Sequence, residues 1–136
     1  MVYAIKTKIG ERHAPTFAFR AQKTMYGGKK IAAGDTIFIF ASENEGGPGL
    51  IACGIVTSAE PIPRQPGIAR QTSRVSITVK RTALARQSLG RRQLKPFSDW
   101  EDSRAETELN FKFYRQATNK IVGLSDGAAR FLRKFF

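Results

Sequence analysis

The fold is decided by residues 34–60, which read GDTIFIFASENEGGPGLIACGIVTSAE. Two runs rich in apolar and β-branched residues, 36–41 and 50–59, flank a polar, glycine-rich segment at 42–49. This arrangement is typical of two antiparallel strands joined by a longer loop. We therefore expect a hairpin here, at the centre of the sheet.

Both faces of the predicted strand at 36–41 are apolar and are expected to be shielded from solvent. Ile37 and Ile39 alternate with Phe38 and Phe40, so both faces of this strand are apolar and both need cover. A curled sheet with a filled interior and helices on its outside supplies both covers. Gly54 lies inside the second run, where a missing side chain indicates a bulge or bend that helps a sheet close.

The rest of the chain supplies further elements. Alternating apolar residues predict strands at 2–8, 74–82 and 109–114. Residues 16–26 fit both a strand and a helix face, and we expect a short helix or irregular structure there. Ser125 is a suitable N-cap for a C-terminal helix. The prediction is one α+β domain over residues 1–136, a small, curled or closed, mostly antiparallel β-barrel with flanking helices.

Charge is the unusual feature of the composition. The chain has 23 Lys and Arg against 11 Asp and Glu, a net charge of +12, with a pI near 10.5. In a chain of 136 residues this excess indicates a polyanionic partner, with a generally solubilising surface as the alternative.

The distribution of charge favours the polyanionic partner. No Asp or Glu occurs from Pro61 to Ser98, while basic residues recur throughout that segment. An unopposed cationic third of the chain is typical of a surface that contacts nucleic-acid phosphates. The phosphate-binding candidates are Arg64, Arg70, Arg74, Lys80, Arg81, Arg86, Arg91 and Arg92.

The remaining composition is that of an ordinary intracellular domain. The single cysteine, Cys53, excludes a disulfide framework and is expected to be a small core residue in a reducing compartment. No stretch resembles a signal peptide or is long enough to cross a membrane. We expect a cytoplasmic protein with no membrane partner, assumed to be a monomer.

The order of these elements resembles the PUA-like superfamily, and most closely its EVE domains. The resemblance rests on Lys6-Thr7 after the first strand, Gly34-Asp35 before FIFAS, GLIACGIVTSAEPI, and RQATNKIVGLSDGAARFL near the C-terminus. It spans nearly the whole chain, although each motif is short. It implies a small barrel that binds nucleic acid and, as in EVE and YTH domains, a pocket for one modified base.

Carried over by position, the resemblance implies Lys6 and Thr7 at the pocket edge and Ser42 at the end of the strand. Here Phe40 and Ala41 replace a tyrosine and a histidine of the family pattern, and its tryptophan motif before Gly-Asp is missing. The pocket is therefore expected to be lined by phenylalanines or to accept something other than a base.

A base pocket needs aromatic faces for stacking and polar groups that read the base edge. Most phenylalanines in a chain of this kind belong to the core, whereas Trp100 lies in a polar, acidic segment. Ser42 and Asn44 fit turn chemistry as well as a site. The base-pocket candidates are Lys6, Thr7, Phe19, Ser42, Asn44, Trp100, Tyr114 and Asn119. The hypothesis is a non-catalytic module that contacts phosphates and accepts one base near Lys6, Ser42 and Trp100.

The residues for catalysis are sparse, and no cofactor or metal is expected. His13 is the only histidine, and Gly46–Gly49 lacks the lysine and hydroxyl of a phosphate loop. Two alternatives stay open. One is a metal-dependent nuclease on an ASCH-like barrel that uses Asp102 or Glu106. The other is an interaction module for an acidic protein. The sequence does not distinguish RNA from DNA.

Overall fold

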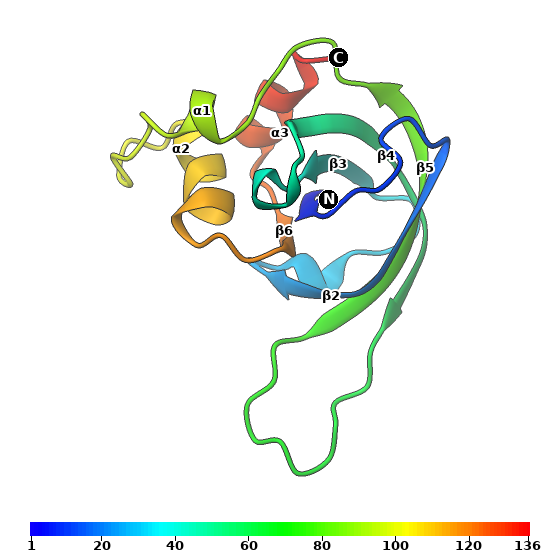
Figure 1. The fold of residues 1–136 in the computed structure, drawn as a ribbon. Coiled ribbons are helices and arrows are strands. Elements are labelled where there is room, and N and C mark those ends of the chain that lie inside the picture. The colour runs from blue at the N-terminus through cyan, green and yellow to red at the C-terminus, as the bar shows by residue number, and fades with distance from the viewer.

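Six strands close into a barrel in the order β1-β3-β4-β5-β2-β6 in the computed structural model, which describes residues 1–136 (Figure 1). Two seams, β1–β3 and β2–β6, are parallel and the other four are antiparallel. The predicted small, mostly antiparallel barrel is confirmed. The strands are β1 (Val2–Thr7), β2 (Thr16–Met25), β3 (Thr36–Ala41), β4 (Gly49–Pro61), β5 (Arg74–Leu84) and β6 (Lys120–Gly123).

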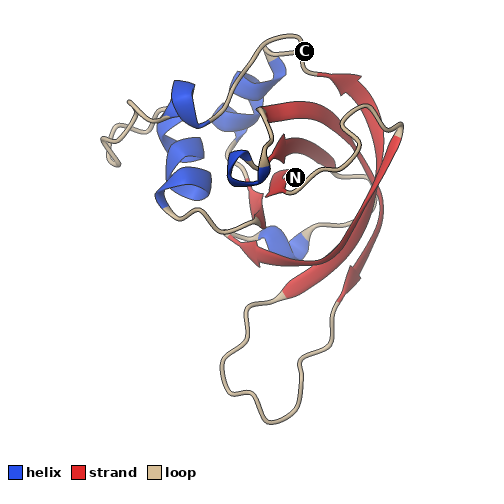
Figure 2. Ribbon diagram, viewed as in Figure 1, coloured by secondary structure: helices blue, strands red, loops and turns tan.

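The helices are short and gather on one side of the barrel (Figure 2). Ser125 caps the C-terminal helix as predicted, because its hydroxyl accepts a hydrogen bond from the Ala128 N–H at 3.1 Å. None of the helices combines the length and the apolar character needed to cross a lipid bilayer. They are α1 (Arg91–Leu94), α2 (Ala105–Asn110), which continues as the π-helical segment η3 (Phe111–Arg115), and α3 (Asp126–Arg133); the 3₁₀ turns are η1 (Gly28–Lys30) and η2 (Glu43–Glu45).

The predicted hairpin is the antiparallel pair β3–β4, and both faces of β3 are covered. Ile37 and Ile39 belong to the interior cluster, which takes apolar residues from every strand. Phe38 and Phe40 belong to a second cluster with residues of α1, α2 and α3 on the outside. In a closed barrel this hairpin is one pair of neighbours rather than the centre of a sheet.

Gly54 marks a bend, as expected. The β4–β5 register shifts between Cys53 and Gly54, and a Cβ at Gly54 would lie 2.4 Å from the Lys80 carbonyl oxygen. Only glycine allows the two backbones to approach this closely. Cys53 itself is partly exposed and packs against the outer cluster, so its predicted place in the core is only partly met.

Two local predictions are wrong. Residues 16–25 form strand β2, which pairs with β5 and β6, because Phe17 and Phe19 pack into the barrel interior. Residues 109–114 are helical, with Leu109 and Phe113 one helical turn apart and both fully buried. At 16–26 the local pattern fits either period, whereas at 109–114 only Leu109 and Phe113 share a helix face, and in both segments tertiary packing decides.

Candidate functional site

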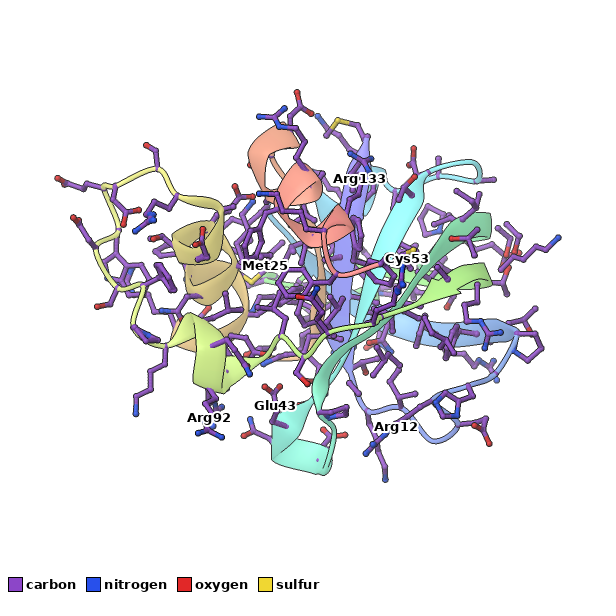
Figure 3. The ribbon with its side chains drawn as sticks, turned by 90° about the horizontal axis from the view of Figure 1, so that it is seen from above. Arg12, Met25, Glu43, Cys53, Arg92 and Arg133 are labelled. Atoms are coloured by element: carbon purple, nitrogen blue, oxygen red, sulfur yellow. The ribbon has the colours of Figure 1, made fainter.

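Three chain segments meet at one end of the barrel, which we call the mouth. The parallel strands β1 and β3 both end there, and the antiparallel strand β6 begins there. Register places Lys6 beside Phe40 on one side and Lys120 on the other. Figure 3 shows Glu43 of η2 on the same side of the molecule as Arg92 of α1. The mouth comprises Lys6, Thr7, Ser42, Glu43, Tyr114, Asn119 and Lys120.

Lys6 is held in a fixed position at the mouth. Its side chain is only 1% exposed, and its Nζ donates a hydrogen bond to the Phe113 carbonyl oxygen at 2.7 Å. The same Nζ lies 4.8 Å from the centroid of the Tyr114 ring, within cation–π range. Burial lowers the pKa of Lys6, while the nearby Glu43 carboxylate opposes that shift. The ammonium group is therefore oriented by the protein and not by solvent.

Lys120 is a second buried cation beside it. It is 0% exposed, and its Nζ donates to the carbonyl oxygens of Gln116 and Thr118 at 3.1 Å each. Burial, and then the positive charge of Lys6, lower its pKa to about 8. Two neighbouring buried ammonium groups favour a ligand that brings negative charge or hydrogen-bond acceptors.

Ser42 has unused hydrogen-bonding capacity. Its side chain is 1% exposed, yet its Oγ has no hydrogen-bond partner in the protein. The Ser42 backbone N–H donates to the Thr7 carbonyl oxygen at 2.9 Å, which fixes the residue against the end of β1. A buried hydroxyl without a partner is uncommon and unfavourable, and a bound polar ligand would satisfy it.

Carboxylates of η2 frame the mouth. Glu43 accepts hydrogen bonds from the Tyr114 hydroxyl at 2.9 Å and from the Arg91 backbone N–H at 2.6 Å. Burial, and then the charge of Glu43, raise the pKa of Tyr114, so this phenol stays protonated. Glu45 accepts from the Asn119 side-chain amide at 3.0 Å. These bonds tie η2 to η3, α1 and the segment before β6.

A shallow hollow of about 270 Å³ opens beside the mouth. The β2 bulge shapes one wall, since Ala21 has a positive φ of 50° there. The Ala21 N–H donates to the Ser76 hydroxyl, and the Ala21 carbonyl oxygen accepts from Arg74 at 2.7 Å. These two hydrogen bonds stabilise the unusual backbone conformation of Ala21. The lining residues are Thr7, Ala21, Gln22, Lys23, Arg74, Thr118 and Asn119.

The structure brings most of the predicted base-pocket residues together. Five of the eight lie at the mouth: Lys6, Thr7, Ser42, Tyr114 and Asn119. Asn44 lies at the rim of the mouth, where its side chain accepts a hydrogen bond from the Arg91 guanidinium at 3.2 Å.

Phe19 and Trp100 are placed elsewhere. Phe19 is in the barrel interior, stacked on Phe17 with ring centroids 5.7 Å apart. Trp100 is exposed and packs on Phe111, with centroids 5.5 Å apart, and on the Arg115 guanidinium. Trp100 therefore covers the helical side of the molecule.

Lys120 was not among the predicted site residues. No strand was predicted at 120–123, because no local pattern marks a four-residue strand whose lysine is buried. The signal would have been the pairing of β1 with β6, which puts Lys120 opposite Lys6.

The phosphate-binding candidates do not form one face. Arg64 and Arg70 lie in the β4–β5 loop, Lys80 is exposed on β5, Arg86 follows β5, and Arg91 and Arg92 begin α1. Arg74 and Arg81 are partly committed, because their guanidinium groups donate to carbonyl oxygens of residues 21 and 14. The acid-free segment thus places cations on a loop, a strand and a helix.

The acidic segment has structural contacts of its own. Glu108 accepts from Lys112 at 3.0 Å and from the Ser125 N–H at 2.9 Å, which joins α2 to the start of α3. Asp102 accepts from the Arg104 N–H, and this bond lowers the pKa of Asp102. No group of three or more His, Cys, Asp or Glu side chains is arranged to hold a metal ion.

Comparison with known proteins identifies the fold. No protein-family model and no curated protein matches the sequence. The structure is similar to the DUF55 domain of human thymocyte nuclear protein 1, with a TM-score of 0.65 and 12% identity over 98% of this chain and 97% of that one. It is also similar to human THYN1 protein in complex with 5-methylcytosine containing DNA, with a TM-score of 0.64 and 11% identity over 98% and 95%. DUF55 is an EVE-type, PUA-like domain, and at this identity the likeness shows that this chain shares its fold.

Proposed function

We propose that this protein is a nucleic-acid-binding module that accepts one modified base at the barrel mouth. The observation that carries the proposal is the unpartnered, buried Ser42 hydroxyl at the same end of the barrel as the oriented ammonium group of Lys6. The similarity to THYN1 protein, whose structure contains 5-methylcytosine DNA, supports the same class of ligand. Phosphate contacts would position the strand, and the mouth would select the base.

The chemistry of the mouth suggests which base edge it accepts. Lys6 is a donor only, and the Ser42 hydroxyl can donate once. Glu43 and Glu45 are already engaged with Tyr114, Arg91 and Asn119, so the free capacity is mainly that of donors. A base edge with neighbouring acceptors, such as the ring nitrogen and carbonyl of cytosine, matches these donors. We take 5-methylcytosine as the first modification to test.

The base must leave its stack to reach such a site. An unpaired base enters directly, whereas a paired base has to be flipped out at an expense of roughly a few kcal/mol. The net charge of +12 supplies long-range attraction to the phosphate backbone, and it acts on any sequence. Affinity and base preference therefore arise from different residues and can be separated by experiment.

The test is fluorescence-anisotropy titration of labelled oligonucleotides across a salt series. Single- and double-stranded DNA and RNA of one sequence are compared with and without 5-methylcytosine or a methylated adenine. The proposal predicts affinity that falls with salt and a preference for one modification. Binding that is indifferent to sugar, strand and modification would contradict base reading. The same samples, incubated with magnesium or with EDTA and run on a gel, report any cleavage.

A further inference from the structure

The loop between β4 and β5, residues 62–73, projects from the barrel and is called the finger here (Figure 1). It has an internal frame provided by Gln71. The Gln71 side-chain oxygen accepts from the Gln65 N–H at 2.9 Å, and its amide nitrogen donates to the carbonyl oxygens of Gln65 and Ile68. These bonds give the finger a defined shape without a hydrophobic core of its own.

The finger presents an unusual combination of side chains. Ile68 directly follows the turn at Gly67, which has a φ of 83°, and its side chain is 49% exposed. Arg64 and Arg70 flank this turn, both exposed, and the finger contains no acidic residue. An apolar side chain at the turn of a cationic projection contributes nothing to the barrel.

Two basic side chains, Lys23 and Arg74, lie between the finger and the mouth. A hollow of about 430 Å³ lies within the finger and is lined by Arg64 and Ile68 among other finger residues, and by Lys23 and Arg74 where the finger meets the barrel. Lys23 and Arg74 also line the smaller hollow beside the mouth. The two hollows therefore share a wall, and a phosphate backbone that leaves the mouth meets Lys23 and Arg74 before it reaches the finger.

We propose that the finger enters a groove of a double-stranded nucleic acid whose target base occupies the mouth. Ile68 inserts between base steps beside the position that the base has left, and Arg64 and Arg70 contact the flanking phosphates. Proteins that kink a duplex use such an apolar wedge next to cationic side chains. This inference rests on the proposed function and adds the form of the substrate, a duplex, and the element that opens it.

Extruding a base breaks its stacking and pairing at one base step. Burying the exposed half of the Ile68 side chain in that step offsets part of the loss. A single strand has no such step to open. The finger should therefore act on duplex binding and leave single-strand binding almost unchanged.

The test compares Ile68→Ser with Ile62→Ser, which removes the other exposed isoleucine of the finger. Affinity is measured for a 5-methylcytosine duplex and for the same strand alone, and 2-aminopurine next to the methylated base reports unstacking. We expect Ile68→Ser to weaken duplex binding about tenfold, equivalent to ~1.4 kcal/mol, and to reduce the 2-aminopurine signal. Ile62→Ser should leave both affinities within about twofold.

The result that overturns the inference is an Ile68→Ser variant that loses no duplex affinity, or that loses duplex and single-strand affinity equally. This outcome is distinct from failure of the proposed function. If the wild-type single strand shows no base preference, the proposed function fails. If that preference persists and Ile68→Ser leaves duplex binding intact, only the finger is excluded. Thermal unfolding of both variants checks that the barrel is unaffected.

Discussion

The barrel mouth and the acid-free segment both carry positive charge, but they hold it in opposite ways. Lys6 and Lys120 are buried, and every hydrogen bond that their ammonium groups donate is accepted by a backbone carbonyl oxygen. The arginines of residues 61–98 are mostly exposed and lie on a loop, a strand and a helix. Buried cations have one geometry and suit selection, whereas exposed cations suit general attraction to phosphate.

The largest effect is expected from the buried side of this comparison. Lys6→Met removes an oriented donor and leaves the Phe113 carbonyl oxygen without its partner. We expect the free energy of unfolding to fall by about 1–3 kcal/mol, because a buried acceptor is left unsatisfied, and base preference to disappear. Denaturant unfolding and anisotropy measure the two effects.

Lys8→Met is the matched control for this variant. Lys8 is exposed just after β1, so the substitution changes the net charge equally without disturbing the mouth. It should retain both stability and base preference. Equal losses in the two variants would contradict a special role for the buried lysine.

A smaller effect is expected from the exposed cations. The double variant Arg64→Gln, Arg70→Gln should keep its stability within about 0.5 kcal/mol, because both side chains are exposed. Its affinity for every duplex should fall, and the slope of log K against log salt should decrease by about 1.8, from two phosphate contacts at about 0.9 each. Base preference should not change.

The control for the exposed cations uses two arginines that lie outside the finger, on α3. Arg130→Gln, Arg133→Gln changes two exposed arginines of α3 and removes the same charge. If this pair lowers the salt slope as much as Arg64 and Arg70 do, the attraction is a property of net charge alone and not of the finger.

The smallest expected effect is a pH dependence of the free energy of unfolding that arises from Lys120. Its pKa is lowered from 10.5 to about 8 in the folded protein. Between these values the unfolded chain holds more protons, so the free energy of unfolding should rise as pH increases from 8 to 10.5. Below pH 8 this contribution should be constant.

The difference between wild type and Lys120→Met isolates that contribution from those of other lysines and tyrosines. Denaturant unfolding from pH 7 to 10.5 should show a rise in the wild type that is smaller in the variant. Nucleic-acid affinity should weaken as pH passes through about 8, because Lys120 loses its charge there. Parallel pH profiles of stability for the two proteins would contradict the lowered pKa.

The sequence alone could predict those elements that local patterns determine. Local patterns were sufficient for the β3–β4 hairpin, because apolar residues on both faces of 36–41 demand both an interior and an outer cover. They were also sufficient for the Ser125 cap. They predicted the wrong structure at 109–114, where the alternation of Leu109, Phe111 and Phe113 fits a strand. Leu109 and Phe113 also lie on one face of a helix, and their packing against the barrel decided.

The site was harder to predict because its key property is non-local. Lys6, Thr7 and Ser42 were found through the family resemblance, but Lys120 becomes visible only when β6 pairs with β1. Trp100 was expected near the mouth because it stands in a polar segment, yet Phe111 and Arg115 cover it on the helical side. The acid-free segment indicated the sign of the partner's charge and could not indicate the arrangement of cations.

Ser42→Ala tests the central claim most directly, because the Ser42 hydroxyl has no partner in the protein and its loss should not destabilise the fold. The measurement is the ratio of affinities for oligonucleotides with 5-methylcytosine and with thymine at the target position, with the free energy of unfolding recorded on the same samples. Thymine has the same 5-methyl group but presents a ring N–H in place of the acceptor nitrogen of cytosine. Base reading at the mouth therefore predicts unchanged or slightly increased stability and a ratio that falls toward one. An unchanged ratio in a fully folded variant would contradict it.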